Sequence, residues 1–154
     1  MRFMIIRKAD AETEGADLPT EELFKQMGDY IEEMVKAGVM LAGDGLKPSR
    51  EGARVKFHNG QPSVIDGPFA ETKELVAGFN IIDVASKEEA IAWVKKWPPL
   101  DGHGEVEIEI RPLYEAEDFG DVFTPEERAR EEKMRAEMAA GTGNAVPEGQ
   151  RPSN

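Results

Sequence analysis

Residues 75–89 read LVAGFNIIDVASKEE, and the class of structure is best judged from this segment outward. Its first ten residues place apolar side chains on both alternating faces, which is typical of a strand that is buried on two sides. Ser86 to Glu89 then has the spacing of a capping box, so a helix should begin there and end at Pro98-Pro99. A two-faced strand that runs directly into a helix predicts a mixed α+β domain.

The same pattern occurs upstream. Residues 2–7 are apolar on both faces, and Thr20 is placed as the N-cap of a helix that Gly38 ends. A short strand at 39–41 and a loop at 42–48, rich in Gly and Pro, should follow.

A hairpin is the clearest local signal. Residues 53–58 and 61–66 flank Asn59-Gly60, a dipeptide that favours a two-residue hairpin turn. Near the end of the domain, residues 105–111 alternate apolar and charged side chains, which indicates a one-sided strand at a sheet edge.

The expected order is strand, helix, strand, inserted hairpin, strand, helix, strand. This is the split βαβ pattern of a ferredoxin-like α+β fold with an inserted β-hairpin. Two helices cover one face of such a sheet, so the apolar residues of the other face need a second cover. A second copy of the chain is the expected cover, and we therefore expect a homodimer.

The domain is expected to span 1–112, with a charged extension at 113–140 that contains a helix over 124–140. Residues 141–154, rich in Gly, Pro, Asn and Ser, are expected to be disordered. The net charge is −12, and the segments before and after Pro112 are both acidic, so neither nucleic acid nor a membrane surface is an expected partner. No apolar run approaches 20 residues, and there is neither an export signal nor a cysteine, so a cytoplasmic location is expected.

The most distinctive segment is Val64 to Leu75, which contains Asp66-Gly67-Pro68-Phe69. Asp66 follows a strand, so its carboxylate could serve proton transfer or ligand orientation at a cleft mouth. The same residue before Gly-Pro is also a good turn former, and the structural role is favoured on that ground. Asp44, between two glycines, has the same two interpretations.

Together with 42–46 and 77–79, this segment resembles the DGPF-motif branch of the YCII-related family, over roughly residues 2–111. The resemblance implies a ferredoxin-like protomer, a homodimer of the dimeric α/β barrel type, and association with extracytoplasmic-function sigma factors. It also implies a cleft in which a His and an Asp cooperate. Asp66 matches that Asp, whereas residues 18–30 contain no His.

The sequence therefore predicts a homodimer that binds a small molecule in a cleft near the DGPF loop, with an enzymatic activity left open. A regulatory partner of a sigma factor, contacting it through the C-terminal helix, and a degradative enzyme of the muconolactone-isomerase kind are the alternatives. No cofactor and no metal site are predicted: His58 should face solvent, and the glycine loop around His103 does not offer a metal geometry. The candidate catalytic residue is Asp66, and the candidate ligand-binding residues are Asp44, Gly67, Pro68, Phe69, Glu71 and Lys73.

Overall fold

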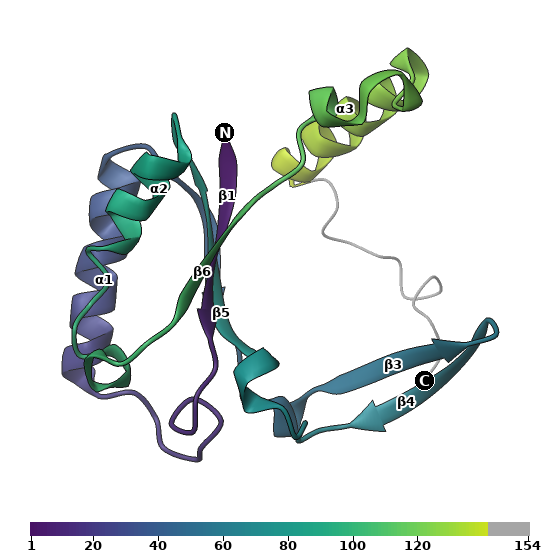
Figure 1. The fold of residues 1–154 in the computed structure, drawn as a ribbon. Helices are drawn as coiled ribbons and strands as arrows, with labels where there is room; N and C mark the ends of the chain where they lie inside the picture. Colours follow the sequence, from purple (N-terminus) through teal and green to yellow (C-terminus); the bar gives the residue numbers. More distant parts are fainter. Residues whose placement is uncertain (142–154) are drawn as a thin grey trace. The chain divides into compact units, whose positions relative to one another are not determined.

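The structure is a computed structural model that describes residues 1–141 (Figure 1). The chain divides into two compact units, Met1–Leu113 and a second one that begins at Tyr114. The segment expected to be disordered, 141–154, lies outside the described residues except for Gly141.

Every strand found within residues 1–141 belongs to the first unit. Its helices and strands are β1 (Arg2–Lys8), α1 (Glu21–Lys36), β2 (Met40–Gly45), β3 (Ala53–His58), β4 (Gln61–Asp66), β5 (Val76–Asp83), α2 (Lys87–Val94) and β6 (Ile108–Pro112).

The main sheet has the strand order β2-β5-β1-β6, and every neighbouring pair is antiparallel. In both β1-α1-β2 and β5-α2-β6, the two strands that the helix connects are separated in the sheet by one other strand. This is the split βαβ arrangement. The β3–β4 hairpin is inserted between β2 and β5 as a separate two-stranded sheet. The prediction of a ferredoxin-like α+β fold with an inserted hairpin is confirmed.

One face of the main sheet is covered by both helices (Figure 1). Phe3 and Ile5 of β1 and Ile82 of β5 are at most 1% exposed on that face, where they pack with Tyr30 and Met34 of α1. The other residues of β1 alternate to the opposite face and are only partly buried.

Local signals fix the first residues of the helices as expected, whereas α2 ends at Val94, earlier than the expected end at Pro98-Pro99. The Thr20 hydroxyl accepts a hydrogen bond from the amide of Leu23 at 3.2 Å, and the Ser86 hydroxyl accepts one from the amide of Glu89 at 3.2 Å. Burial raises the pKa of Tyr30 to about 12, with a smaller contribution from Glu33, and its hydroxyl donates to the carbonyl oxygen of Trp93.

Two expected strand boundaries are wrong. Residues 42–45, predicted as loop, belong to β2, because this glycine-rich segment hydrogen-bonds along β5 with Gly43 opposite Asn80. The last strand begins at Ile108 rather than at 105, since residues 101–104 form a short 3-10 helix and the chain pairs with β1 only from Ile108 onward. The expected edge position of β6 is correct.

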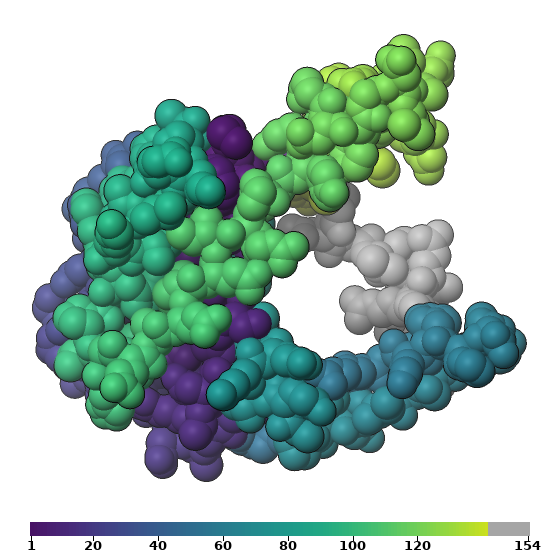
Figure 2. Space-filling model, viewed as in Figure 1, coloured from purple at the N-terminus to yellow at the C-terminus, as the bar shows by residue number. Residues whose placement is uncertain are grey.

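The inserted hairpin has the predicted turn. Asn59 and Gly60 have φ of 49° and 75°, and the register runs from Ala53 opposite Asp66 to His58 opposite Gln61. Every residue of both strands is exposed, which Figure 2 shows along the blue segment. The hairpin therefore contributes little to the core of this unit.

The second unit is built around α3 (Pro125–Ala139), which Thr124 caps by accepting from the amide of Glu127. Arg128 donates to the carbonyl oxygens of Ala116 and Phe123 and so ties α3 to the segment before it. No residue of α3 is buried. Across residues 1–141, none of the helices has the length and apolar character needed to cross a bilayer.

Candidate functional site

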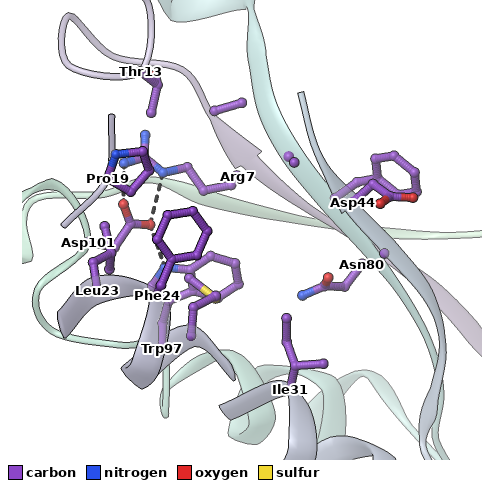
Figure 3. Close-up of a pocket in the computed structure, with 16 residues that line it drawn as sticks. Arg7, Thr13, Pro19, Leu23, Phe24, Ile31, Asp44, Asn80, Trp97 and Asp101 are labelled. Atoms are coloured by element: carbon purple, nitrogen blue, oxygen red, sulfur yellow. Dashed lines mark hydrogen bonds and ion pairs between the residues drawn. The ribbon is translucent and has the colours of Figure 1, made fainter. Parts of the chain in front are cut away.

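A pocket of about 230 Å³ opens between the first half of α1 and the edge of the sheet formed by β2 and β5 (Figure 3). Its wall is largely apolar, and its polar side chains come from β1, β5 and the loop after α2. The apolar side chains of the wall are Pro19, Leu23, Phe24, Met27, Ile31 and Trp97, whereas Ala77 and Phe79 of β5 alternate to the other face of the sheet.

One end of the pocket is formed by the buried ion pair of Arg7 and Asp101, and Arg7 also binds the partly exposed Asp10, which lies outside the pocket lining. The Nε and Nη2 atoms of Arg7 donate to the two carboxylate oxygens of Asp101 at 3.0 and 2.7 Å, and Nη1 donates to Asp10 Oδ2 at 2.7 Å. Nη1 also donates to the carbonyl oxygen of Lys8, and the Trp97 indole donates to Asp101 Oδ2 at 2.8 Å. Arg7 is 5% exposed and Asp101 7%.

Arg7 and Asp10 are both held in their charged forms. Burial by itself would lower the pKa of Arg7, but its hydrogen bonds to the two carboxylates outweigh burial and raise that pKa. Burial would raise the pKa of Asp10, but the amide of Thr13 and the guanidinium of Arg7 outweigh it and lower that pKa. One cation and two carboxylates leave the cluster of Arg7, Asp10 and Asp101 with a net charge of about −1.

Asn80 provides the second polar group of the pocket. It lies in β5 opposite Ile5 of β1 and Gly43 of β2, and alternation along the strand turns its side chain to the helix-covered face. In Figure 3 its amide points into the pocket. Asn80 is 7% exposed, and its side chain makes no hydrogen bond with any residue between 1 and 141.

Gly43 leaves the space that the Asn80 amide occupies. A Cβ atom on Gly43 would lie 2.3 Å from Asn80 Oδ1 and 3.0 Å from the carbonyl oxygen of Phe79, and both distances are too short for real contacts. The glycine in the middle of β2 is therefore a requirement of the pocket wall. It is not a sign of a loop.

Of the predicted site residues, only Asp44 lies at this pocket. It pairs with Phe79, one position along from the Gly43–Asn80 pair, so its carboxylate points to the opposite face of the strand (Figure 3). Asp44 thus borders the pocket through its backbone, and its side chain is not near Asn80 or Arg7.

The remaining predicted site residues, Asp66 to Phe69 with Glu71 and Lys73, lie at the base of the hairpin and are not part of the pocket wall. Asp66 is exposed and closes the β3–β4 ladder opposite Ala53. Gly67 donates to the carbonyl oxygen of Gly52, and a Cβ on Gly67 would lie 1.8 Å from the carbonyl oxygen of Ser49. The loop is therefore fitted closely to the segment before β3.

Ser49 joins this loop to the rest of the unit. Its hydroxyl accepts from the amide of Phe69 at 3.1 Å and donates to the Glu14 carboxylate at 2.5 Å. The guanidinium of Arg54 lies 3.9 Å from the centre of the Phe69 ring. These contacts give the segment 66–69 an anchoring role at the base of the hairpin, and its catalytic or binding role stays a prediction.

Arg7, Asn80, Trp97 and Asp101 were not predicted as site residues from the sequence. For Arg7 and Asn80, the sequence pattern does contain an indication. Arg7 continues the Phe3–Ile5 face of β1, and Asn80 precedes Ile82 on the same face of β5. A polar residue at a core-facing position needs a partner, and this rule could have marked both.

Comparison with known proteins gives three findings. A family model described as the YCII-related domain matches residues 1–114. An uncharacterized protein of Rhizobium meliloti (strain 1021) is 35% identical over 96 residues, which cover 60% of this chain and 74% of that protein.

A solved structure of a 5-chloro-2-hydroxyhydroquinone dehydrochlorinase from Burkholderia phenoliruptrix AC1100, in complex with 2,5-dihydroxybenzoquinone, is 16% identical. The match covers 74% of this chain and 94% of that chain with a TM-score of 0.36, which is too low to support an argument about the pocket.

Proposed function

The chain belongs to the YCII-related domain family, and on that basis we propose that it is a DGPF-type homodimer that binds a small molecule in the pocket between α1 and the sheet. The observation that carries this proposal is the side-chain amide of Asn80, which points into the pocket and has no hydrogen-bond partner among residues 1–141, although the residue is only 7% exposed. Its amide atoms stay open to the pocket, so a ligand there can make the hydrogen bonds that the described residues do not make.

The wall of the pocket favours recognition over catalysis. On the helix-covered side its ionisable side chains are Arg7 and Asp101, and each is bound to the other. A general acid or base needs a proton that it can exchange within hydrogen-bond reach of the ligand. Asn80 cannot supply one, because an amide does not titrate in the physiological range.

A thermal-shift screen of metabolites against the wild-type protein and an Asn80→Leu variant tests ligand binding. We expect a metabolite to raise the melting temperature of the wild type and to have a much smaller effect on the variant. Without ligand, the variant should be about as stable as the wild type, because the Asn80 side chain makes no hydrogen bond with residues 1–141 that leucine would remove. The control is Ser63→Ala, an exposed hairpin position that should respond like the wild type. Equal responses of wild type and Asn80→Leu to every metabolite would count against this pocket.

The proposed dimer is supported by the second face of the sheet. Met4, Ile6, Phe79 and Ile81 lie on that face at the centre of β1 and β5 and are only partly buried. Lys8, Glu109 and Arg111 border them, and the Glu109 carboxylate forms ion pairs with both cations within the same chain. A second copy related by a two-fold axis can bury the apolar centre.

Light scattering tests the dimer. The wild type should have the mass of a dimer at micromolar concentration, and Ile81→Arg should convert it to a monomer with an unchanged circular dichroism spectrum. Val35→Arg, an equally drastic change at a 57% exposed position of α1, should remain dimeric. A monomeric wild type would refute the interface.

The Asn80→Leu variant, a deletion of residues 124–139 and the metabolite screen together separate the two alternative functions. A regulatory partner that binds through α3 would leave Asn80→Leu fully functional and would lose binding when 124–139 is deleted. A degradative enzyme of the muconolactone-isomerase kind would turn over a lactone that the metabolite screen includes.

A further inference from the structure

The chemistry of the pocket wall also limits which ligands it can hold. Arg7 is the cation at the pocket, and a guanidinium has five N–H groups. Four hydrogen bonds from Arg7 are already made, to Asp101 twice, to Asp10 and to the carbonyl oxygen of Lys8. At most one N–H group is left, so Arg7 cannot grip a carboxylate or phosphate with the paired bonds that such groups need.

Charge works against anions as well. Arg7 and Asp101 line the apolar cavity as an ion pair with no net charge, and Asp10, which binds Arg7 from outside the lining, adds a negative charge. An anionic ligand would lose its hydration there without gaining a free cation. The wall therefore selects against anions.

Asn80 is the group that can recognise a ligand. Its side chain offers an N–H donor and a C=O acceptor next to each other, and neither has a partner among residues 1–141. Such an amide forms two parallel hydrogen bonds with an edge that carries a donor beside an acceptor, as asparagine does with adenine in DNA.

The size and surface of the pocket favour a ring. A cavity of about 150 Å³ lined by apolar side chains holds benzene, so 230 Å³ is enough for one ring with small substituents. Phe24 and Trp97 line the cavity and offer aromatic surfaces for stacking or edge contacts.

We infer that this pocket binds a neutral, single-ring molecule whose edge carries an adjacent hydrogen-bond donor and acceptor, such as a cyclic amide, and that Asn80 reads this edge. The inference rests on the proposed function of the pocket and narrows its ligand class. Carboxylates and phosphates of the same size are excluded by the wall.

The test is titration of the full-length protein with four probes, followed by the NMR signals of the Asn80 side-chain amide and the Trp97 indole. The probes are 2-pyridone, which has both groups; N-methyl-2-pyridone, which lacks the donor; benzoate, which is an anion; and toluene, which has neither group. The exposed Asn59 side-chain amide in the hairpin turn is the internal reference and should not move.

We expect 2-pyridone to shift the Asn80 amide and to bind about tenfold more tightly than its N-methyl form, the effect of one lost hydrogen bond. Benzoate should not shift either signal. In Asn80→Leu the preference for 2-pyridone over toluene should disappear. Gly43→Ala, which moves the amide without replacing it, should reduce the preference in the same way and provides a second variant if Asn80→Leu does not fold.

The titration distinguishes a wrong ligand class from a pocket that binds no ligand. If benzoate or toluene shifts the Trp97 indole as strongly as 2-pyridone does, the pocket binds ligands but the inferred class is wrong. If none of the probes shifts Trp97 or Asn80, the pocket is not a ligand site, and the proposed function fails together with the inference.

Discussion

Replacing Asp101 by alanine should be among the most destabilising single changes in the first unit. The change removes both hydrogen-bonded partners of the Arg7 Nε and Nη2 atoms and the acceptor of the Trp97 indole, and it leaves a cation that is 5% exposed. Breaking a buried ion pair on one side costs about 3–5 kcal/mol. Because Asp10 remains on Nη1, we expect the lower end of that range, about 3 kcal/mol.

Urea unfolding measures this loss. With a slope of about 2 kcal/mol per M for a domain of this size, a loss of about 3 kcal/mol lowers the midpoint by about 1.5 M urea. The slope should not change if only the stability is affected.

The matched control is Asp29→Ala. Lys25 and Asp29 also form an ion pair at 2.7 Å, the distance of the Arg7 Nη2–Asp101 contact, but both side chains are more than 60% exposed. Solvent screens an exposed helical pair, so it contributes little, and alanine regains part of that through its helix propensity. The control midpoint should therefore move much less than that of Asp101→Ala.

If Asp101→Ala and Asp29→Ala lower the midpoint equally, burial does not set the contribution of the Arg7 cluster, and our reasoning on the pocket wall is refuted. A double variant, Arg7→Met with Asp101→Leu, should recover much of the loss, because it removes both buried charges together.

Three further predictions follow from the described geometry. The folded-state pKa of Asp10 lies below its ordinary value of 3.8, so the stabilisation by its charged form is complete above that value and is lost as the pH falls through the folded-state pKa. The difference in unfolding free energy between wild type and Asp10→Asn should therefore be constant from about pH 7 to 5 and disappear below about pH 4. Urea unfolding across pH measures it. Gly67→Ala should lower the free energy of unfolding by more than about 1 kcal/mol, because its Cβ would meet the carbonyl oxygen of Ser49 at 1.8 Å. The Cβ of Gly45→Ala meets nothing within 4 Å, and Asp66→Asn changes an exposed carboxylate. Each of these two variants should change the free energy of unfolding by less than about 0.5 kcal/mol in the same assay. Deleting residues 124–154 should leave the melting temperature of the first unit nearly unchanged in calorimetry, because none of the residues of α3 is buried, and a loss of several degrees would show that the helix packs on the domain.

Several elements were predictable because their determinants are local. Thr20 and Ser86 cap the helices that follow them, and Asn59-Gly60 supplies the two positive φ angles of the hairpin turn. Each of these signals acts within four residues of the element that it sets. The ferredoxin-like order of strands and helices followed from them.

The DGPF segment shows what a sequence motif leaves open about position. Its residues are conspicuous in the chain, yet the structure fits Gly67 and Phe69 against Ser49 and Gly52 at the base of the hairpin, outside the pocket wall. The motif could be found from the sequence, but the segment against which it lies could not, because that contact is made 15 to 20 residues away.

The sequence by itself determined the helices, the strands and the alternation that puts Arg7 and Asn80 on the core-facing side of β1 and β5. Only the tertiary structure decided that Arg7 meets Asp101, 94 residues away, and that Asn80 lies against Gly43 with no hydrogen-bond partner for its side chain among the described residues 1–141. Alternation is a property of one strand and repeats every two residues, whereas a buried polar group is satisfied or left open by segments that reach it from elsewhere in the chain.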